Sequence, residues 1–345
     1  MSRETVPSTP SAGTTAPRER VLAALRGERV APVPVGAVTQ SATSFQMERL
    51  SAFWPEAHVD ARQMARLAEG ARTLLGFDMV RVPFDQTIEA ELLGAEIDCG
   101  DASSNCAVRS HPLSLGDLVP EFPTIKKGRA ETVVEAIWIL RGRLGPEAAV
   151  IGGVVGPFTI VCQLAGVTNV VMDALRRPEV VRPAIDLAVQ VGIEYARLQV
   201  DSGADAICVE DMSASLDLTS PRIYEDLILP AQRRLIAGIR APVILHVCGT
   251  NTKILHLLSR SGAAALSLES KTDLGKAVAE GSSAVIGGVA PVEVLLHGTT
   301  EDVRRASTEC LEAGVHVLAP GCGIPVNTPI ENLQEMVRVA HGWRA

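Results

Sequence analysis

Short apolar runs alternate with longer amphipathic segments along most of the chain. The apolar runs are hydrophobic almost throughout, which is typical of strands in a parallel sheet that is covered on both faces. They span residues 33–38, 78–84, 148–155, 205–210, 243–248, 265–269, 284–289 and 315–320. The segments between them carry helical periodicity, for example over residues 132–143, 178–202, 221–239 and 300–313.

Strands that alternate with helices predict parallel βαβ units, and eight such units close into a (β/α)8 TIM barrel of the α/β class. An open doubly wound sheet is the alternative, because the same alternation permits it. Residues 87–118 alternate polar and apolar positions around Gly94 and Gly100, so we expect a β-hairpin excursion after the second strand. We expect one barrel domain over residues 18–345, after a disordered Ser/Thr/Pro-rich N-terminal tail over residues 1–17.

Composition narrows the classes of function. The chain has 345 residues and a formal net charge of -8, which argues against a nucleic-acid partner. It contains no run of about 18 uninterrupted apolar residues, so no membrane span is expected. The tail lacks the apolar core of a signal peptide, which makes the cytoplasm the expected location. Seven cysteines, an odd number in a long chain of this kind, argue against a disulfide framework.

Ligand-type side chains end three of the predicted strands. In a barrel the working face is the carboxyl end of the strands. His246 and Cys248 are two positions apart at the end of one strand, so in an extended chain both point to the same side. Glu269 ends the next strand, and Cys322 follows the last one. The sequence therefore predicts that these four residues converge at one rim.

Two thiolates, an imidazole and a carboxylate are ligands that zinc prefers, whereas thiolates disfavour magnesium and calcium. Such a site would hold a substrate thiol as its reactive thiolate at neutral pH. A core histidine and a packed thiol are the alternative for the His246/Cys248 pair, and Glu269 is either a direct ligand or a partner that orients His246. Asp85 and Glu210 also end strands, where they are either substrate contacts or structural groups.

Two motifs carry a family resemblance. The sequence HVCG from His246 and the sequence PGCGIPVNTPIENL from Pro320 resemble the methylcobamide:coenzyme M methyltransferases, which belong to the uroporphyrinogen decarboxylase superfamily. The likeness extends over nearly the whole chain after the tail and includes RVPFDQTIEAELLG from Arg81 and GPFT from Gly156. The cysteine motif around Cys322 is the most specific of these, whereas the GPFT element is shared by the superfamily.

The resemblance implies a barrel enzyme whose zinc is held by His246, Cys248 and Cys322. Glu269 stands where the similar cobalamin-independent methionine synthases have a glutamate. The implied reaction transfers a methyl group from methylcobamide on a partner corrinoid protein to a small thiol, with coenzyme M as the acceptor or homocysteine as the alternative. A uroporphyrinogen decarboxylase activity is the other alternative. That enzyme grips substrate carboxylates with arginines near its amino terminus, and residues 33–40 here contain none.

Overall fold

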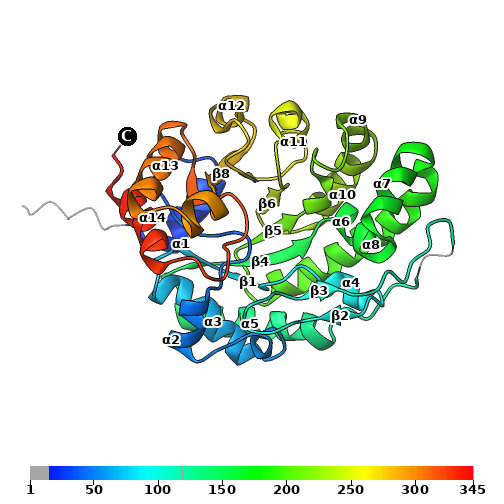
Figure 1. The fold of residues 1–345 in the computed structure, drawn as a ribbon, viewed down its shortest axis with the longest axis horizontal. Coiled ribbons are helices and arrows are strands. Elements are labelled where there is room, and N and C mark those ends of the chain that lie inside the picture. The colour runs from blue at the N-terminus through cyan, green and yellow to red at the C-terminus, as the bar shows by residue number, and fades with distance from the viewer. Residues whose placement is uncertain (1–14, 118–119, 345) are drawn as a thin grey trace, which may run out of the picture.

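A curled parallel sheet forms the centre of the molecule, and helices surround it (Figure 1). The computed structural model describes residues 15–117 and 120–344. The strands of the sheet follow chain order, so the reversal of order that a doubly wound sheet requires is not observed. The predicted α/β class with a parallel sheet is confirmed. The strands are β1 (Met79–Val82), β4 (Ala149–Val155), β5 (Ala206–Glu210), β6 (Val243–His246), β7 (Ala265–Leu268), β8 (Ala284–Val289) and β9 (Val317–Pro320).

The first predicted strand, residues 33–38, is reduced to an isolated parallel bridge between Val35 and Leu318 of β9. On the other side of this segment, the Asp78 amide just before β1 donates to the Val35 carbonyl at 2.8 Å. The segment therefore lies between the last strand and the first strand of the sheet. The prediction of a full strand here was wrong because Pro32 and Pro34 lack the N–H groups that a longer ladder needs.

Helices occupy the predicted segments, with one interruption. The predicted helix over residues 221–239 is divided by a π-helical turn, Tyr224–Ile228, which ends two residues before Pro230. Proline cannot donate the i→i−4 hydrogen bond, and this disturbs the turn before it. The helices are α1 (Pro17–Leu25), α2 (Ser44–Leu50), α3 (Ala61–Thr73), α4 (Ile88–Leu92), α5 (Gly128–Leu144), α6 (Pro157–Ala165), α7 (Val167–Arg176), α8 (Pro178–Asp201), α9 (Pro221–Ile223), α10 (Leu229–Gly238), α11 (Leu255–Leu258), α12 (Leu274–Glu280), α13 (Thr300–Glu312) and α14 (Ile330–Gly342).

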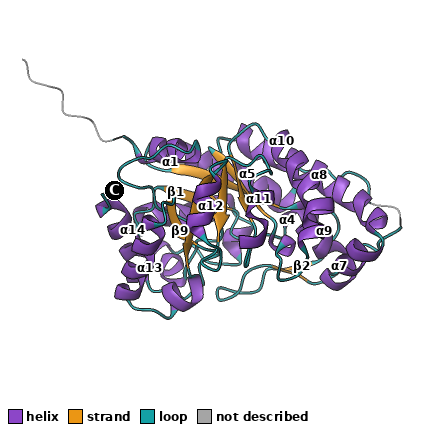
Figure 2. Ribbon diagram, turned by 90° about the horizontal axis from the view of Figure 1, so that it is seen from above, coloured by secondary structure: helices purple, strands orange, loops and turns teal. Residues whose placement is uncertain are grey.

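A two-stranded antiparallel sheet lies apart from the central one (Figure 2). Its strands β2 (Ile97–Asp98) and β3 (Ala107–Val108) pair Ile97 with Val108 and Asp98 with Ala107. They follow β1 and α4, within the segment 87–118. The hairpin is therefore part of the long connection between β1 and α5.

The amino-terminal end of the sheet is closed by α1. Its Val21, Ala24 and Leu25 pack in one buried cluster with side chains from inside the curled sheet. Arg20 of the same helix forms a buried ion pair with Asp78 at 2.8 Å. The helix begins at Pro17, and residues 1–14 of the predicted tail lie outside the described residues.

Among the described helices, none is by itself long and apolar enough to cross a membrane. The pair α6 and α7 meets the criterion of length and composition only when joined, and the two helices are bent by 115° at their junction.

Candidate metal centre

Alternation along the strands brings polar groups to one end of the sheet interior. The inward positions form apolar layers that pack in one buried cluster, namely Met79, Ala149, Ile151, Ala206, Cys208, Ile244, Ala265, Ala284, Ile286, Val317 and Ala319. Side chains two positions apart share a face of a strand. The next inward position after Cys208 is therefore Glu210, and the next after Ile244 is His246. Both are buried and stand opposite each other in the β5–β6 register.

Three of the predicted ligands come together at this end. Cys248 Sγ lies 3.3 Å from His246 Nε2 and 3.8 Å from Cys322 Sγ. The imidazole of His246 is fully buried, whereas both cysteines are half-buried. The three ligand atoms all lie within 4.8 Å of one another. Residues 74 positions apart in the chain thus share one small site.

The donor set and its spacing fit a tetrahedral zinc ion. Bond lengths of about 2.3 Å to sulfur and 2.0–2.1 Å to nitrogen give sulfur–sulfur separations of about 3.8 Å and sulfur–nitrogen separations of about 3.5 Å. The separations of 3.8 Å between the two sulfurs and 3.3 Å between Cys248 Sγ and His246 Nε2 are close to these values. A cation of this size therefore fits the cluster with little side-chain movement.

A neighbouring strand orients the imidazole. His246 Nδ1 lies 3.2 Å from the carbonyl oxygen of Ser267 and 3.2 Å from its Oγ. A proton on Nδ1, donated to that carbonyl, leaves the Nε2 lone pair free for a metal. Metal-binding histidines in proteins are commonly fixed in this way.

The electrostatics of the cluster favour a thiolate. The hydrogen bond with Cys248 and the adjacent His246 hold the pKa of the Cys322 thiol below its ordinary value, although burial acts in the opposite direction. The contact with Cys322, together with burial, raises the pKa of Cys248. Burial by itself would lower the pKa of His246, but the hydrogen bond with Cys322 raises it. Since the thiolate is the form that binds metals, the pair of sulfurs beside the imidazole is suited to hold one.

The fourth predicted ligand lies beside the cluster in a different arrangement. Glu269 Oε1 accepts a hydrogen bond from the backbone amide of Gly249 at 2.7 Å. Gly249 has φ of 80°, and a Cβ at this position would lie 2.4 Å from Asp217 Oδ2. The turn after Cys248 thus requires glycine, and Glu269 holds that turn in place. Its carboxylate is not among the group of mutually close ligand atoms, so its direct ligation stays a prediction.

Asp85 lies just beyond β1, where it was predicted, and its carboxylate is surrounded by polar groups. Arg129 Nη1 donates to both carboxylate oxygens at 3.0 Å, and the amide and hydroxyl of Thr87 donate to Oδ1. His58 Nδ1 lies 3.4 Å from Oδ2. Burial alone would raise the pKa of Asp85, but His58 and Arg129 lower it well below its ordinary value. The carboxylate is therefore charged, and its partners belong to the protein.

Glu210 is likewise paired within the protein. Its Oε1 forms an ion pair with Arg81 on β1, and its Oε2 accepts a hydrogen bond from Gln86 Nε2 at 2.7 Å. Burial raises the pKa of Glu210, while Arg81 and His246 act in the opposite direction. The carboxylate of Glu210 is near enough to His246 and Cys322 to influence both. A role of Asp85 and Glu210 in binding substrate stays a prediction.

Three residues of this region were not identified from the sequence. His58 is buried beside Asp85 and stacks on Trp54. Arg129 comes from the first turn of α5, and Glu89 of α4 is fully buried with an amide of β4 as its partner. Of the three, only Glu89 could have been suspected from the sequence to be a buried charged residue, since it stands between the apolar residues Ile88 and Ala90.

The cysteines divide into three kinds. Cys162, Cys208 and Cys310 are buried thiols, and Cys248 and Cys322 form the cluster. Cys99 and Cys106 are joined by a disulfide at the end of the β2–β3 hairpin. The odd number of cysteines argued against a framework of several disulfides, but it says nothing about a single bond between two cysteines of one hairpin. This bond was therefore not predicted.

The protein is thus a parallel α/β barrel with a His/Cys2 cluster at the carboxyl ends of its strands. The chain matches the profile of the family Uroporphyrinogen decarboxylase (URO-D) over residues 16–343, and it belongs to this family.

Similar proteins agree with the resemblance read from the motifs. The chain is 39% identical over 336 residues to "Methylcobamide:CoM methyltransferase MtbA" of Methanosarcina mazei, covering 95% of this chain and 98% of that protein. It is 33% identical over 325 residues to "Methylcobamide:CoM methyltransferase MtaA" of Methanosarcina barkeri, covering 93% and 96%. The solved structure of a methyltransferase from Methanosarcina mazei matches with a TM-score of 0.90 at 34% identity, covering 95% and 98%. The predicted likeness to methylcobamide:coenzyme M methyltransferases is confirmed.

Proposed function

We propose that this protein is a zinc-dependent methyltransferase that moves a methyl group from a methylated corrinoid protein to a small thiol, with coenzyme M as the acceptor. The observation that carries the proposal is the convergence of His246 Nε2, Cys248 Sγ and Cys322 Sγ within 4.8 Å of one another. The names of the similar proteins support a methylcobamide as the methyl donor and coenzyme M as the acceptor. We place the reaction in the cytoplasm.

In this proposal His246, Cys248 and Cys322 hold zinc, and Glu269 is the fourth ligand. Bound zinc supplies the Lewis acidity that keeps an acceptor thiol as a thiolate at neutral pH. Glu269 would complete the set of ligands while its Oε1 keeps the Gly249 amide as a hydrogen-bond partner. Ser267 fixes the tautomer of His246 so that Nε2 faces the cluster.

The charged groups beside the cluster are paired within the protein. Arg81 and Glu210 form a buried pair next to the cluster, so the region carries no isolated charge from either residue.

The corrinoid protein is expected to dock over the same end of the barrel. Its methyl group must lie in line with the thiolate, because well-oriented reactants lower the barrier to displacement. Asp85 and Glu210 are proposed to contact the acceptor or to position its surroundings.

The test combines a metal assay with an activity assay. Purified protein is analysed for zinc and then incubated with methylcobalamin and a panel of thiols that includes coenzyme M and homocysteine. Cys248→Ala and Cys322→Ala are expected to lose both zinc and thiol methylation, whereas Cys310→Ala, which removes a buried thiol from α13, is expected to retain both. Full methylation by a zinc-free variant would overturn the mechanism. Methylation of homocysteine but not coenzyme M would reassign the acceptor.

A further inference from the structure

The disulfide between Cys99 and Cys106 lies outside the metal centre and has no role in the proposed methyl transfer. The two cysteines flank the loop of the hairpin, directly beyond the paired residues Asp98 and Ala107. Both are half-buried, and the loop residues between them are largely exposed. A small molecule can therefore approach the sulfur–sulfur bond from the loop side.

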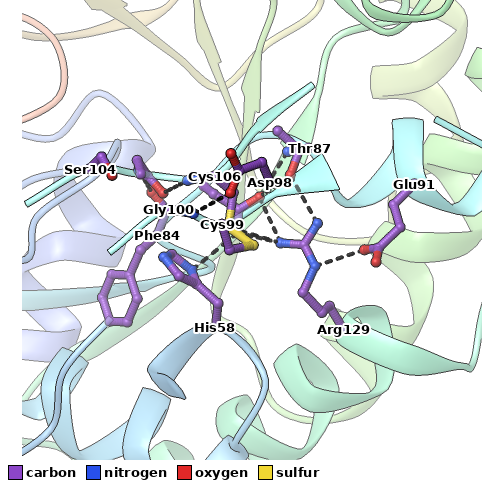
Figure 3. Close-up of a disulfide and its surroundings, with 12 residues drawn as sticks. His58, Phe84, Thr87, Glu91, Asp98, Cys99, Gly100, Ser104, Cys106 and Arg129 are labelled. Carbon is purple, nitrogen blue, oxygen red and sulfur yellow. Dashed lines mark hydrogen bonds and ion pairs between the residues drawn. A yellow bond between two sulfur atoms is a disulfide. The ribbon is translucent and has the colours of Figure 1, made fainter. Parts of the chain in front are cut away.

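The two sulfurs have different surroundings. On the inner side, Arg129 lies beside Cys106 (Figure 3), with Nη1 3.5 Å from Cys106 Sγ. The same nitrogen also donates to Asp85. His58, Asp85 and Cys106 bring one ligand-type atom each within 4.8 Å of one another. Cys106 thus lies in a pocket of fixed charges. Among the described contacts, no such group faces Cys99, and the neighbouring Asp98 is paired with Arg109.

This asymmetry decides which sulfur can leave as an anion. In thiol–disulfide exchange a thiolate attacks one sulfur, and the reaction is faster when the departing thiolate is stabilised. The guanidinium of Arg129 would stabilise a thiolate on Cys106 by charge and hydrogen bonding. Attack at Cys99 therefore places the departing thiolate on Cys106 beside Arg129, whereas attack at Cys106 would place it on Cys99, for which the described contacts include no cation.

We propose that Cys99–Cys106 is a thiol-exchange site for small-molecule thiols, with Cys99 as the attacked sulfur and Cys106 as the leaving group. The thiol loses its proton to solvent and its thiolate bonds to Cys99 Sγ. The Cys99–Cys106 bond breaks, and Cys106 departs with the electron pair beside Arg129. A second thiol then attacks the mixed disulfide at the sulfur of the bound small molecule. The balance is two thiols and the protein disulfide converted to one small-molecule disulfide and two cysteine thiols.

Exchange also has a consequence for the rim. Arg129 holds Asp85 through both of its carboxylate oxygens in the oxidised form. A thiolate on Cys106 would compete for the same guanidinium nitrogen, because Nη1 makes both contacts. Reduction of the disulfide by a small thiol, the class of molecule that the enzyme is proposed to methylate, would therefore change the hydrogen bonds made to Asp85.

The experiment uses the full-length protein purified without reductant and glutathione as the probe thiol. Samples are quenched at short times with iodoacetamide and mapped by peptide mass spectrometry. The expected early product carries glutathione on Cys99 and the alkyl group on Cys106, while the buried Cys208 serves as an unlabelled internal control. The proposal would be overturned if glutathione were found on Cys106, on both cysteines equally, or on neither. It would also be overturned if both cysteines were alkylated before glutathione is added, because the disulfide would then be absent.

Variants test the role of charge. Arg129→Gln is expected to slow exchange about tenfold, since leaving-group stabilisation controls the rate, and Arg129→Lys is expected to restore most of it. Equal rates in all three proteins would contradict the assignment of Cys106. If Arg129→Gln does not fold, the proposal is still tested by comparing the exchange rates of Arg129→Lys and wild type and by the cysteine on which glutathione is mapped. Cys106→Ser should form no adduct, because a free Cys99 thiol has no disulfide to exchange. Because the experiment measures peptide masses and not methylation, a negative result would not count against the proposed methyl transfer.

Discussion

The carboxyl group of Glu89 makes the stability of this fold depend on pH over an unusual range. Glu89 is fully buried in α4, and its Oε1 accepts a hydrogen bond from the Val155 amide at 2.8 Å. Burial, with added repulsion from the nearby carboxylates of Asp85 and Glu210, raises the pKa of Glu89 from its ordinary value of 4.5 to about 8. The group is therefore neutral in the folded protein at pH 7 and ionised in the unfolded chain.

The direction of the effect follows from the protons bound in each state. Below about pH 4.5 both states hold the proton, and Glu89 has no effect on the pH dependence. Between about 4.5 and about 8 the unfolded chain holds fewer protons, so stability falls as pH rises. The loss is about 1.4 kcal/mol for each pH unit, or about 5 kcal/mol across the whole interval. Above about pH 8 the contribution of Glu89 no longer changes.

Glu89→Gln removes the ionisation and keeps the shape of the side chain. We expect urea denaturation between pH 5 and 9 to give similar free energies of unfolding for variant and wild type near pH 5. The variant should become more stable than wild type by several kcal/mol near pH 8.5, within the limit of about 5 kcal/mol given above. Metal binding also varies with pH, but it contributes equally to both proteins and cancels in the difference.

Glu312→Gln is the matched control, because Glu312 is an exposed glutamate at the end of α13. Its curve should follow that of wild type at every pH. Parallel curves for wild type and Glu89→Gln would refute the reasoning, since they would show that Glu89 binds the same number of protons in both states.

Three further substitutions test other parts of the structure. Asp85→Asn removes one of the two carboxylates that pair with Arg129, the other being that of Glu91, and thermal denaturation should show a loss of about 1.5–3 kcal/mol. Gly156→Ala places a Cβ 2.2 Å from Asp211 Cβ, and the resulting overpacking should cost about 1–3 kcal/mol in urea denaturation. Glu269→Gln should weaken zinc binding by about 10–100-fold in a chelator competition assay. Unchanged stability in the first two variants, or unchanged zinc affinity in the third, would contradict the roles given to these residues.

The strands were predictable because a parallel sheet covered on both faces leaves continuous apolar runs in the sequence. The run at residues 33–38 passed the same test, yet its prolines limit it to the bridge at Val35. Hydrophobicity predicts which segments enter the core, whereas the length of a ladder also depends on available N–H groups. The break between α9 and α10 has the same origin, since Pro230 lies inside a continuous amphipathic pattern.

The cluster of His246, Cys248 and Cys322 was predictable because each of these residues stands at the end of a strand, and the barrel brings strand ends together. His246 and Cys248 share a face by alternation alone. Partners that come from helices could not be found in this way. Arg129 is 44 residues from Asp85, and no local periodicity relates the two. The Cys99–Cys106 bond depends on the register of a two-residue ladder, which alternation of polar and apolar residues does not fix.

The central claim is that His246, Cys248 and Cys322 hold a zinc ion that remains open to an incoming sulfur. X-ray absorption at the zinc edge tests this claim most directly, with spectra of the zinc-loaded protein recorded before and after addition of coenzyme M. We expect a mixed shell of sulfur with nitrogen or oxygen that gains a further sulfur when the thiol is added. A zinc shell that is identical in the two spectra would contradict the account, because it would indicate a closed structural site.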